Sequence, residues 1–503
     1  MTSTKRNIIA NFAGQGWSAF VQVAFVPVYV HLLGIEGYGL IGFFATLQAA
    51  LQVFDLGISG TMNRELARLT AIPSRANEAC TLARTFEVLY WAIGCMIAAG
   101  VFLSAPLIAH HWVKVENTPI TTVVGAVRIM AILAGLQFPV TLYHGGLMGL
   151  QRQTAYNAIK VFTATLAGAG AAAIVAFVSQ TVTAFFAWQL FVALLQVSIL
   201  WRTLWSHLPH SDRDIRFRLS ALREVWRFAA GMTAVSVSGM AAGQMDKILL
   251  SKLLSLSNFG YYSIASLAAN LLFILSNPVY YALFPRFATY FAQDDTAGVD
   301  ALYRKGTELI AVLVFPVAAV LAVFAPQVIT LWTRSPATAR AVAPLLRLLL
   351  IGTAAHGLRN LLGALQYAYG WTSIGMKLNA ALLALLVPAL LLLTPRYGPA
   401  YAAGSWSLAV VIVWAVGVVI THRRILSLRP STWALIDIIP PFVVSVFAAV
   451  TCRAVLPAAA GWYGTAASIL ATLFFALAVS ASVAPCVRHQ LHAAFGGLRS
   501  RYA

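Results

Sequence analysis

The chain has 503 residues, of which 60% are apolar and only 10% are charged. A soluble protein carries about 25% charged residues, and disordered chains are rich in charge and poor in apolar residues, so both classes are excluded and an integral membrane protein is expected. The 34 Lys and Arg against 15 Asp and Glu give a net charge of +19. In a membrane protein this excess indicates basic cytoplasmic loops rather than a nucleic-acid partner.

Apolar segments long enough to cross a bilayer recur along the whole chain. A spanning helix needs about 20 mostly apolar residues, and the sequence predicts 14 such spans and therefore an all-α polytopic fold. In chain order they are 8–33, 38–60, 80–104, 121–148, 157–178, 183–204, 228–252, 260–284, 306–330, 342–366, 374–394, 401–420, 435–456 and 464–484.

The distribution of basic residues predicts how the chain is oriented. Most Lys and Arg, among them Arg6, Arg64, Arg216 and Arg424, fall at helix ends that are cytoplasmic if the N-terminus is cytoplasmic. An even number of spans then returns the C-terminus to the same side. We expect a multi-pass membrane protein with both termini in the cytoplasm.

A weak internal repeat divides the chain. Residues 32–67 align with residues 253–288, and this alignment places Gly39 on Gly260. Six spans separate the copies, so the two halves have parallel orientation, which is typical of transporters whose substrate path lies between the repeats. We predict one six-helix lobe over 1–210, a second over 211–425, and two further helices with a cytoplasmic tail over 426–503.

Charged side chains inside the spans are candidates for function, because each costs on the order of 3 kcal/mol in lipid. Four cations against two acids favour an anionic ligand, and the Arg fork suits phosphate. The candidate substrate-binding residues are Arg128, Lys247, Arg347, His356 and Arg359, and the candidates for ion coupling or gating are Asp55 and Asp246.

Structural interpretations compete at several of these positions. Asp246 and Lys247 are adjacent, about 100° apart around a helix, so each could pair with another helix and lock the packing. Arg347 lies near the end of its span and could extend to the membrane interface. Asp55 could satisfy backbone groups where its span ends.

No motif in the sequence indicates an enzyme. There is no GxxxxGK[ST] loop and no HExxH, and none of Cys80, Cys95, Cys452 and Cys486 lies in a CxxC pair. We therefore expect no catalytic residue, no metal site and no cofactor. Transport would be driven by a gradient, and a carboxylate in a low-dielectric site, such as Asp55 or Asp246, could carry H⁺ or Na⁺ coupling.

Two long segments resemble one family. The segment NFAGQGWSAFVQVAFVPVYVHLLGIEGYGLIGFFATLQAALQVFDLGISGTMNRELAR and the segment GQMDKILLSKLLSLSNFGYYSIASLAANLLFILSNPVYYALFPRFA are similar to the openings of the two halves of Wzx-type oligosaccharide flippases. These belong to the polysaccharide branch of the multidrug/oligosaccharidyl-lipid/polysaccharide exporter superfamily. The family's acid–base pair corresponds to Asp246–Lys247, and its GYY segment to Gly260–Tyr262.

The resemblance implies a fold and a substrate. It implies two MATE-like six-helix lobes around a central cavity that opens alternately to each side of the membrane. The implied substrate is an oligosaccharide repeat unit on undecaprenyl pyrophosphate, moved to the periplasmic leaflet for O-antigen or exopolysaccharide assembly. Membrane lipids, and polymerase or export machinery, would be the partners, with no nucleic acid.

Three other functions compete with this one. A MATE-type drug exporter usually has acidic cavity residues, and the first span, 8–33, has no Asp or Glu. A lipid II flippase typically has an arginine in that span, and this chain has none there. A membrane enzyme or assembly scaffold of envelope synthesis is the third, and the chain shows no acidic cluster that would support an enzyme.

Overall fold

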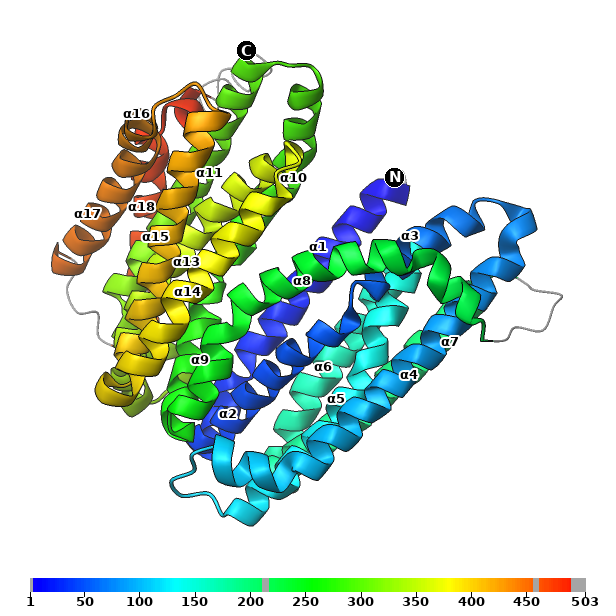
Figure 1. Ribbon diagram of the computed structural model, residues 1–503. Coiled ribbons are helices and arrows are strands. Elements are labelled where there is room, and N and C mark those ends of the chain that lie inside the picture. Colours follow the sequence, from blue (N-terminus) through cyan, green and yellow to red (C-terminus); the bar gives the residue numbers. More distant parts are fainter. Residues whose placement is uncertain (1–2, 210–216, 456–460, 490–503) are drawn as a thin grey trace, which may run out of the picture. The chain divides into compact units, whose positions relative to one another are not determined.

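The computed structural model describes residues 3–209, 217–455 and 461–489, and the regular secondary structure of these residues is helical (Figure 1). The chain forms two compact units, Met1–Gly260 and Tyr261–Ala503, called here the first and the second unit. The cytoplasmic tail predicted at the C-terminus lies partly in 490–503, outside the described residues.

The first unit is built from long apolar helices packed on one another. The helix α5 lies against α4 on one side and α7 on another, and α6 packs on α1. The helix α8 lies against α2, α3 and α4, and therefore belongs to this unit. The helices are α1 (Ser3–Ala24), α2 (Val26–Leu51), α3 (Ile58–Thr70), α4 (Ala76–Leu107), α5 (Ile120–Gly149), α6 (Gln153–Phe177), α7 (Val182–His207) and α8 (Leu219–Leu253).

The second unit has α13 at its centre, with α10, α11, α12 and α15 packed around it. Most residues of α13 are covered by neighbouring helices, because α13 is apolar on nearly all sides. The chain enters this unit through α9 (Leu256–Asn270) and continues as α10 (Leu272–Ala292), α11 (Thr296–Val323), α12 (Ala325–Thr333), α13 (Pro336–Ala368), α14 (Thr372–Tyr397), α15 (Pro399–Arg424), α16 (Pro430–Trp433), α17 (Ile439–Val455) and α18 (Gly461–Val483).

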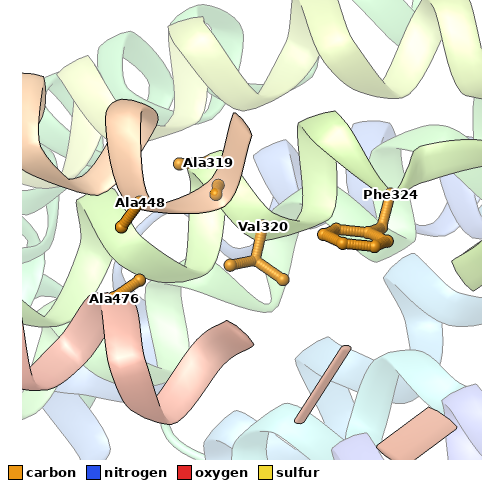
Figure 2. Packing of buried hydrophobic residues seen from close by; sticks show 6 residues of the cluster. Ala319, Val320, Phe324, Ala448 and Ala476 are labelled. Carbon is orange, nitrogen blue, oxygen red and sulfur yellow. The ribbon is translucent and has the colours of Figure 1, made fainter. Parts of the chain in front are cut away.

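Small residues fasten the last two long helices to α11. Figure 2 shows Ala319, Val320 and Phe324 at the end of α11 against Ala448 of α17 and Ala476 of α18. Between membrane helices there is no hydrophobic driving force, so close contact depends on small side chains that let the backbones approach. The two further helices predicted after the second lobe therefore pack directly on α11, within the second unit.

The helices agree with the predicted spans in number and place. Among the described residues, 11 helices are long and apolar enough to cross a membrane, and the bent pair α9 and α10, at 42° to each other, makes a twelfth. Of the remaining two predicted spans, 8–33 falls on α1 and the start of α2, and 228–252 falls on α8. The all-α polytopic fold with about 14 helices is confirmed.

Some helix ends differ from the predicted ones. The predicted span 306–330 begins too late, because α11 starts at Thr296 with Asp295 accepting a hydrogen bond from the amide of Gly298 as its N-cap. Its end is also different, since the chain breaks at Phe324 and α12 follows. Within α2 the backbone leaves helical geometry at Gly34, with φ 72° and ψ 175°, which separates the predicted spans 8–33 and 38–60.

Candidate functional site

The second unit brings Arg359 and His356 together with polar and aromatic neighbours. Arg359 donates from Nη2 to Oδ1 of Asn379 on α14. One turn earlier on α13, the ring of His356 meets Phe273 of α10 edge-on, with centroids 5.2 Å apart. The His356 Nδ1 atom is buried and has no hydrogen-bond partner among the described residues. Such an atom is available to a polar ligand or to water.

Arg347 lies earlier than Arg359 on α13 and contacts the end of α11. Its side chain is exposed, and its Nε atom donates to the carbonyl oxygen of Ala322, 3.0 Å away. Ala322 is in the last turn of α11, whose carbonyl groups have no partner within their own helix. The Arg347 side chain therefore caps the end of α11, while its predicted roles in substrate binding and at the membrane interface stay predictions.

Arg128 lies in the first unit, on the helix α5. Its side chain is exposed, and its guanidinium carbon lies 5.2 Å from the centre of the Phe102 ring on α4. A cation over an aromatic face is attracted by the ring quadrupole while its N–H groups stay free to donate. The arrangement holds Arg128 in place without a carboxylate partner among the described residues.

The adjacent residues Asp246 and Lys247 of α8 have different surroundings. Asp246 is buried, whereas Lys247 is half-buried. This difference follows from the rotation of about 100° between neighbouring residues of a helix. The helix α8 packs against α2, α3 and α4, so both side chains belong to the first unit and not to the unit that holds Arg359.

Asp55 lies where the helical backbone is broken. It ends the short 3₁₀ helix Gln52–Asp55, and the next residues, Leu56 and Gly57, both have left-handed backbone conformations. Its carboxylate accepts hydrogen bonds from the hydroxyl of Tyr90 and, at 2.9 Å, from that of Ser59. The break frees backbone groups within a long apolar segment, and Asp55 lies among hydroxyl donors there.

Sequence reasoning missed several buried acids. Glu87 in α4 accepts from Tyr143 at 3.0 Å, from Trp205 at 3.1 Å and from Arg84 at 2.7 Å. Glu308 in α11 is also buried, and at the offset of the internal repeat it corresponds to Glu87. The count of two acids within the spans was wrong, since Glu87, Glu308 and the buried Asp437 all fall inside predicted spans and could have been counted there.

The buried acids are engaged in packing contacts. Glu308 accepts from the backbone amide of Cys486 at 2.7 Å, and Asp437 holds Arg304 through two hydrogen bonds of 2.9 Å. By contrast, Arg128 and Arg359 have no carboxylate within ion-pair distance among the described residues. Arg128 and Arg359 are therefore distinct from cations such as Arg304 and Arg347, which make contacts between helices.

Comparisons with known proteins agree with this fold. The chain is 21% identical to a Shigella flexneri protein provisionally named an O-antigen transporter, over 81% of this chain and 95% of that one. It is similar to the lipid II flippase MurJ in an inward closed conformation, with a TM-score of 0.72 and 11% identity, covering 95% of this chain and 98% of that chain.

A second solved structure supports the same conclusion about the fold. An inward-facing multidrug resistance MATE transporter of the MOP superfamily matches with a TM-score of 0.71 and 14% identity, over 83% of this chain and 96% of that chain. The family model described as polysaccharide biosynthesis protein matches residues 28–334, more than half of the chain. The resemblance seen in the sequence is thereby confirmed, and the chain belongs to this family of polysaccharide biosynthesis proteins.

Proposed function

We propose that the protein is a flippase for undecaprenyl-pyrophosphate-linked oligosaccharide repeat units, which it moves from the cytoplasmic to the periplasmic leaflet by alternating access. The observation that carries this proposal is a set of cations on membrane helices, Arg128, Lys247 and Arg359, in a member of the polysaccharide biosynthesis family. A diphosphate cannot cross hydrocarbon unaided, because burying an unpaired charge is prohibitive.

The contacts of the arginines support a role in binding phosphate. Arg359 donates one hydrogen bond from its guanidinium to Asn379, and the guanidinium of Arg128 lies over an aromatic ring. Each keeps N–H donors for a phosphate oxygen, which Arg binds well because of its fork geometry. His356 would add a further polar contact to the substrate beside Arg359. Arg347 would contact the substrate only near the end of α11, where its side chain lies.

Coupling to H⁺ or Na⁺ is proposed for Asp55, with Asp246 as a second candidate. Asp55 is half-buried and already bound by two hydroxyl groups, so a proton or a cation would compete with these donors. We further propose that the protein lies in the bacterial inner membrane with cytoplasmic termini, and that polysaccharide polymerase or export machinery takes up its product.

The test follows the lipid-linked oligosaccharide in spheroplasts depleted of the protein. A glycosidase added outside should fail to reach the sugar after depletion and should reach it again after re-expression. Unchanged sidedness together with sensitivity to cationic drugs would instead identify an exporter, and trapped lipid II would identify a lipid II flippase.

A matched pair of variants then tests the cation argument. Arg359→Gln is expected to lower flipping by about tenfold or more, since a charge-assisted hydrogen bond is lost. Arg340→Gln, at an exposed position near the start of the same helix, should flip at the parent rate. Equal flipping by both variants in equally expressed protein would count against phosphate binding at Arg359.

A further inference from the structure

Two glycines at equivalent positions of the internal repeat make a reciprocal contact. A Cβ atom at Gly39 of α2 would lie less than 3.0 Å from the carbonyl oxygen of Leu256, and one at Gly260 of α9 would lie 2.7 Å from the carbonyl oxygen of Ile35. The repeat that aligns Gly39 with Gly260 also aligns Ile35 with Leu256. Each helix therefore presents a glycine to the backbone of the other, and we call this contact the glycine crossing.

A short connection between helices, residues 113–119, is tied to α2 beside the crossing. The carboxylate of Glu36 accepts hydrogen bonds from the backbone amides of Glu116, Asn117 and Thr118, at 3.2, 2.9 and 2.9 Å. It also accepts from the side chains of Asn117 at 3.1 Å and Thr118 at 2.5 Å. One buried carboxylate thus fixes three successive residues of this connection.

The same connection is tied to the turn between α8 and α9. Lys114 forms an isolated parallel β-bridge with Ser255, and its carbonyl oxygen accepts from the amide of Leu256 at 2.8 Å. The Ser257 hydroxyl donates to the carboxylate of Glu116 at 2.7 Å. Ser257 corresponds to Glu36 in the repeat, so the connection binds equivalent points of both copies.

We propose that residues 113–119 form a strap over a hinge at the glycine crossing, and that transport requires the strap to loosen. The four residues of the crossing, Ile35, Gly39, Leu256 and Gly260, all lie in the first unit, which ends at Gly260 within α9. Two backbones that touch without side chains can shift along each other, whereas interlocked side chains would hold one register. The proposal rests on the proposed function.

Alanine variants test the close approach of the two backbones. Gly39→Ala and Gly260→Ala each add a methyl group where a carbonyl oxygen stands, and each is expected to lower flipping by about tenfold. Gly100→Ala and Gly125→Ala are matched controls in α4 and α5, because a Cβ there meets no atom within 4 Å. Equal flipping by all four variants would overturn the hinge.

A disulfide tests the strap directly. The backbones of Lys114 and Ser255 are neighbours in a β-bridge, within the separation that a disulfide needs. In a background without native cysteines, Lys114→Cys with Ser255→Cys should lose flipping when oxidised and regain it when reduced. Parent-like flipping by the oxidised pair would show that the strap stays closed during transport and would overturn the proposal.

Hydrogen exchange separates this proposal from the proposed function. In the parent, the amides of residues 116–118 should be protected, and Glu36→Gln should make them exchange faster, whether or not any lipid is flipped. Unprotected amides in the parent, or no change in Glu36→Gln, would overturn the strap. If the parent does not flip the oligosaccharide lipid while these amides behave as expected, the proposed function fails and the strap stands.

Discussion

The ion pair between Arg304 and Asp437 should respond very differently to the loss of each partner. Two hydrogen bonds of 2.9 Å join the guanidinium on α11 to the carboxylate of Asp437, which precedes α17. The Asp437 side chain is 0% exposed, whereas that of Arg304 is 31% exposed. An orphaned Asp437 would stay buried, but an orphaned Arg304 can extend toward water or lipid headgroups.

The expected losses in the free energy of unfolding follow from this difference. Arg304→Gln leaves a buried carboxylate without its cation, which costs about 3 kcal/mol, the low end for a broken buried pair. Asp437→Asn leaves a partly exposed guanidinium and keeps one acceptor, so about 1.5 kcal/mol is expected. The double variant should lose less than the sum of the two, because neither charge is left unpaired.

Reversible unfolding in mixed micelles, followed by tryptophan fluorescence, measures these losses. Lys305→Gln is the matched control, since it removes an exposed cation from the next position of the same helix. A loss for Asp437→Asn equal to or larger than that for Arg304→Gln would refute the reasoning from burial. Additive losses in the double variant would show that the two residues do not interact.

Three further predictions concern buried polar groups. Burial, together with Glu308, raises the pKa of the Cys486 thiol to about 11. Maleimide should therefore alkylate this thiol roughly a hundredfold more slowly at pH 8 than an ordinary thiol. The variant Glu308→Gln should make the alkylation faster. Because the folded chain holds this proton to higher pH than the unfolded chain, its stability should fall between about pH 9 and 11. Glu87→Gln should cost about 1.5–3 kcal/mol in unfolding experiments, since three donors lose a charged acceptor. Tyr90→Phe should lower stability by about 1–2 kcal/mol, and an unchanged melting temperature would show that its hydrogen bond to Asp55 is unimportant.

Composition and hydropathy were sufficient to predict the fold, because lipid imposes long apolar helices on any chain that crosses it. The repeat was visible in few identities, yet it includes the two glycines that meet in the structure. The helix breaks were harder to predict. Nothing in hydropathy marks Phe324, where α11 gives way to α12, since apolar residues continue on both sides.

The candidate site was predictable only as a set of residue types. The sequence singled out Arg359 and His356, and the structure places both on α13, but their contacts come from residues on α10 and α14 that no local pattern connects to them. Likewise, the capping role of Arg347 depends on the end of another helix. The division of lobes predicted at 210/211 stays a prediction.

The fastening of α11 has a consequence for how the chain is made. The partner of Arg304, Asp437, lies 133 positions later in the chain, and the partner of Glu308, Cys486, lies 178 positions later. At about 5–20 residues per second, the ribosome delivers Asp437 roughly 7–27 s after Arg304. During that interval α11 carries charges without these partners, so the second half of the protein can reach its final packing only near the end of synthesis, and truncation before α17 should leave a target for membrane quality control.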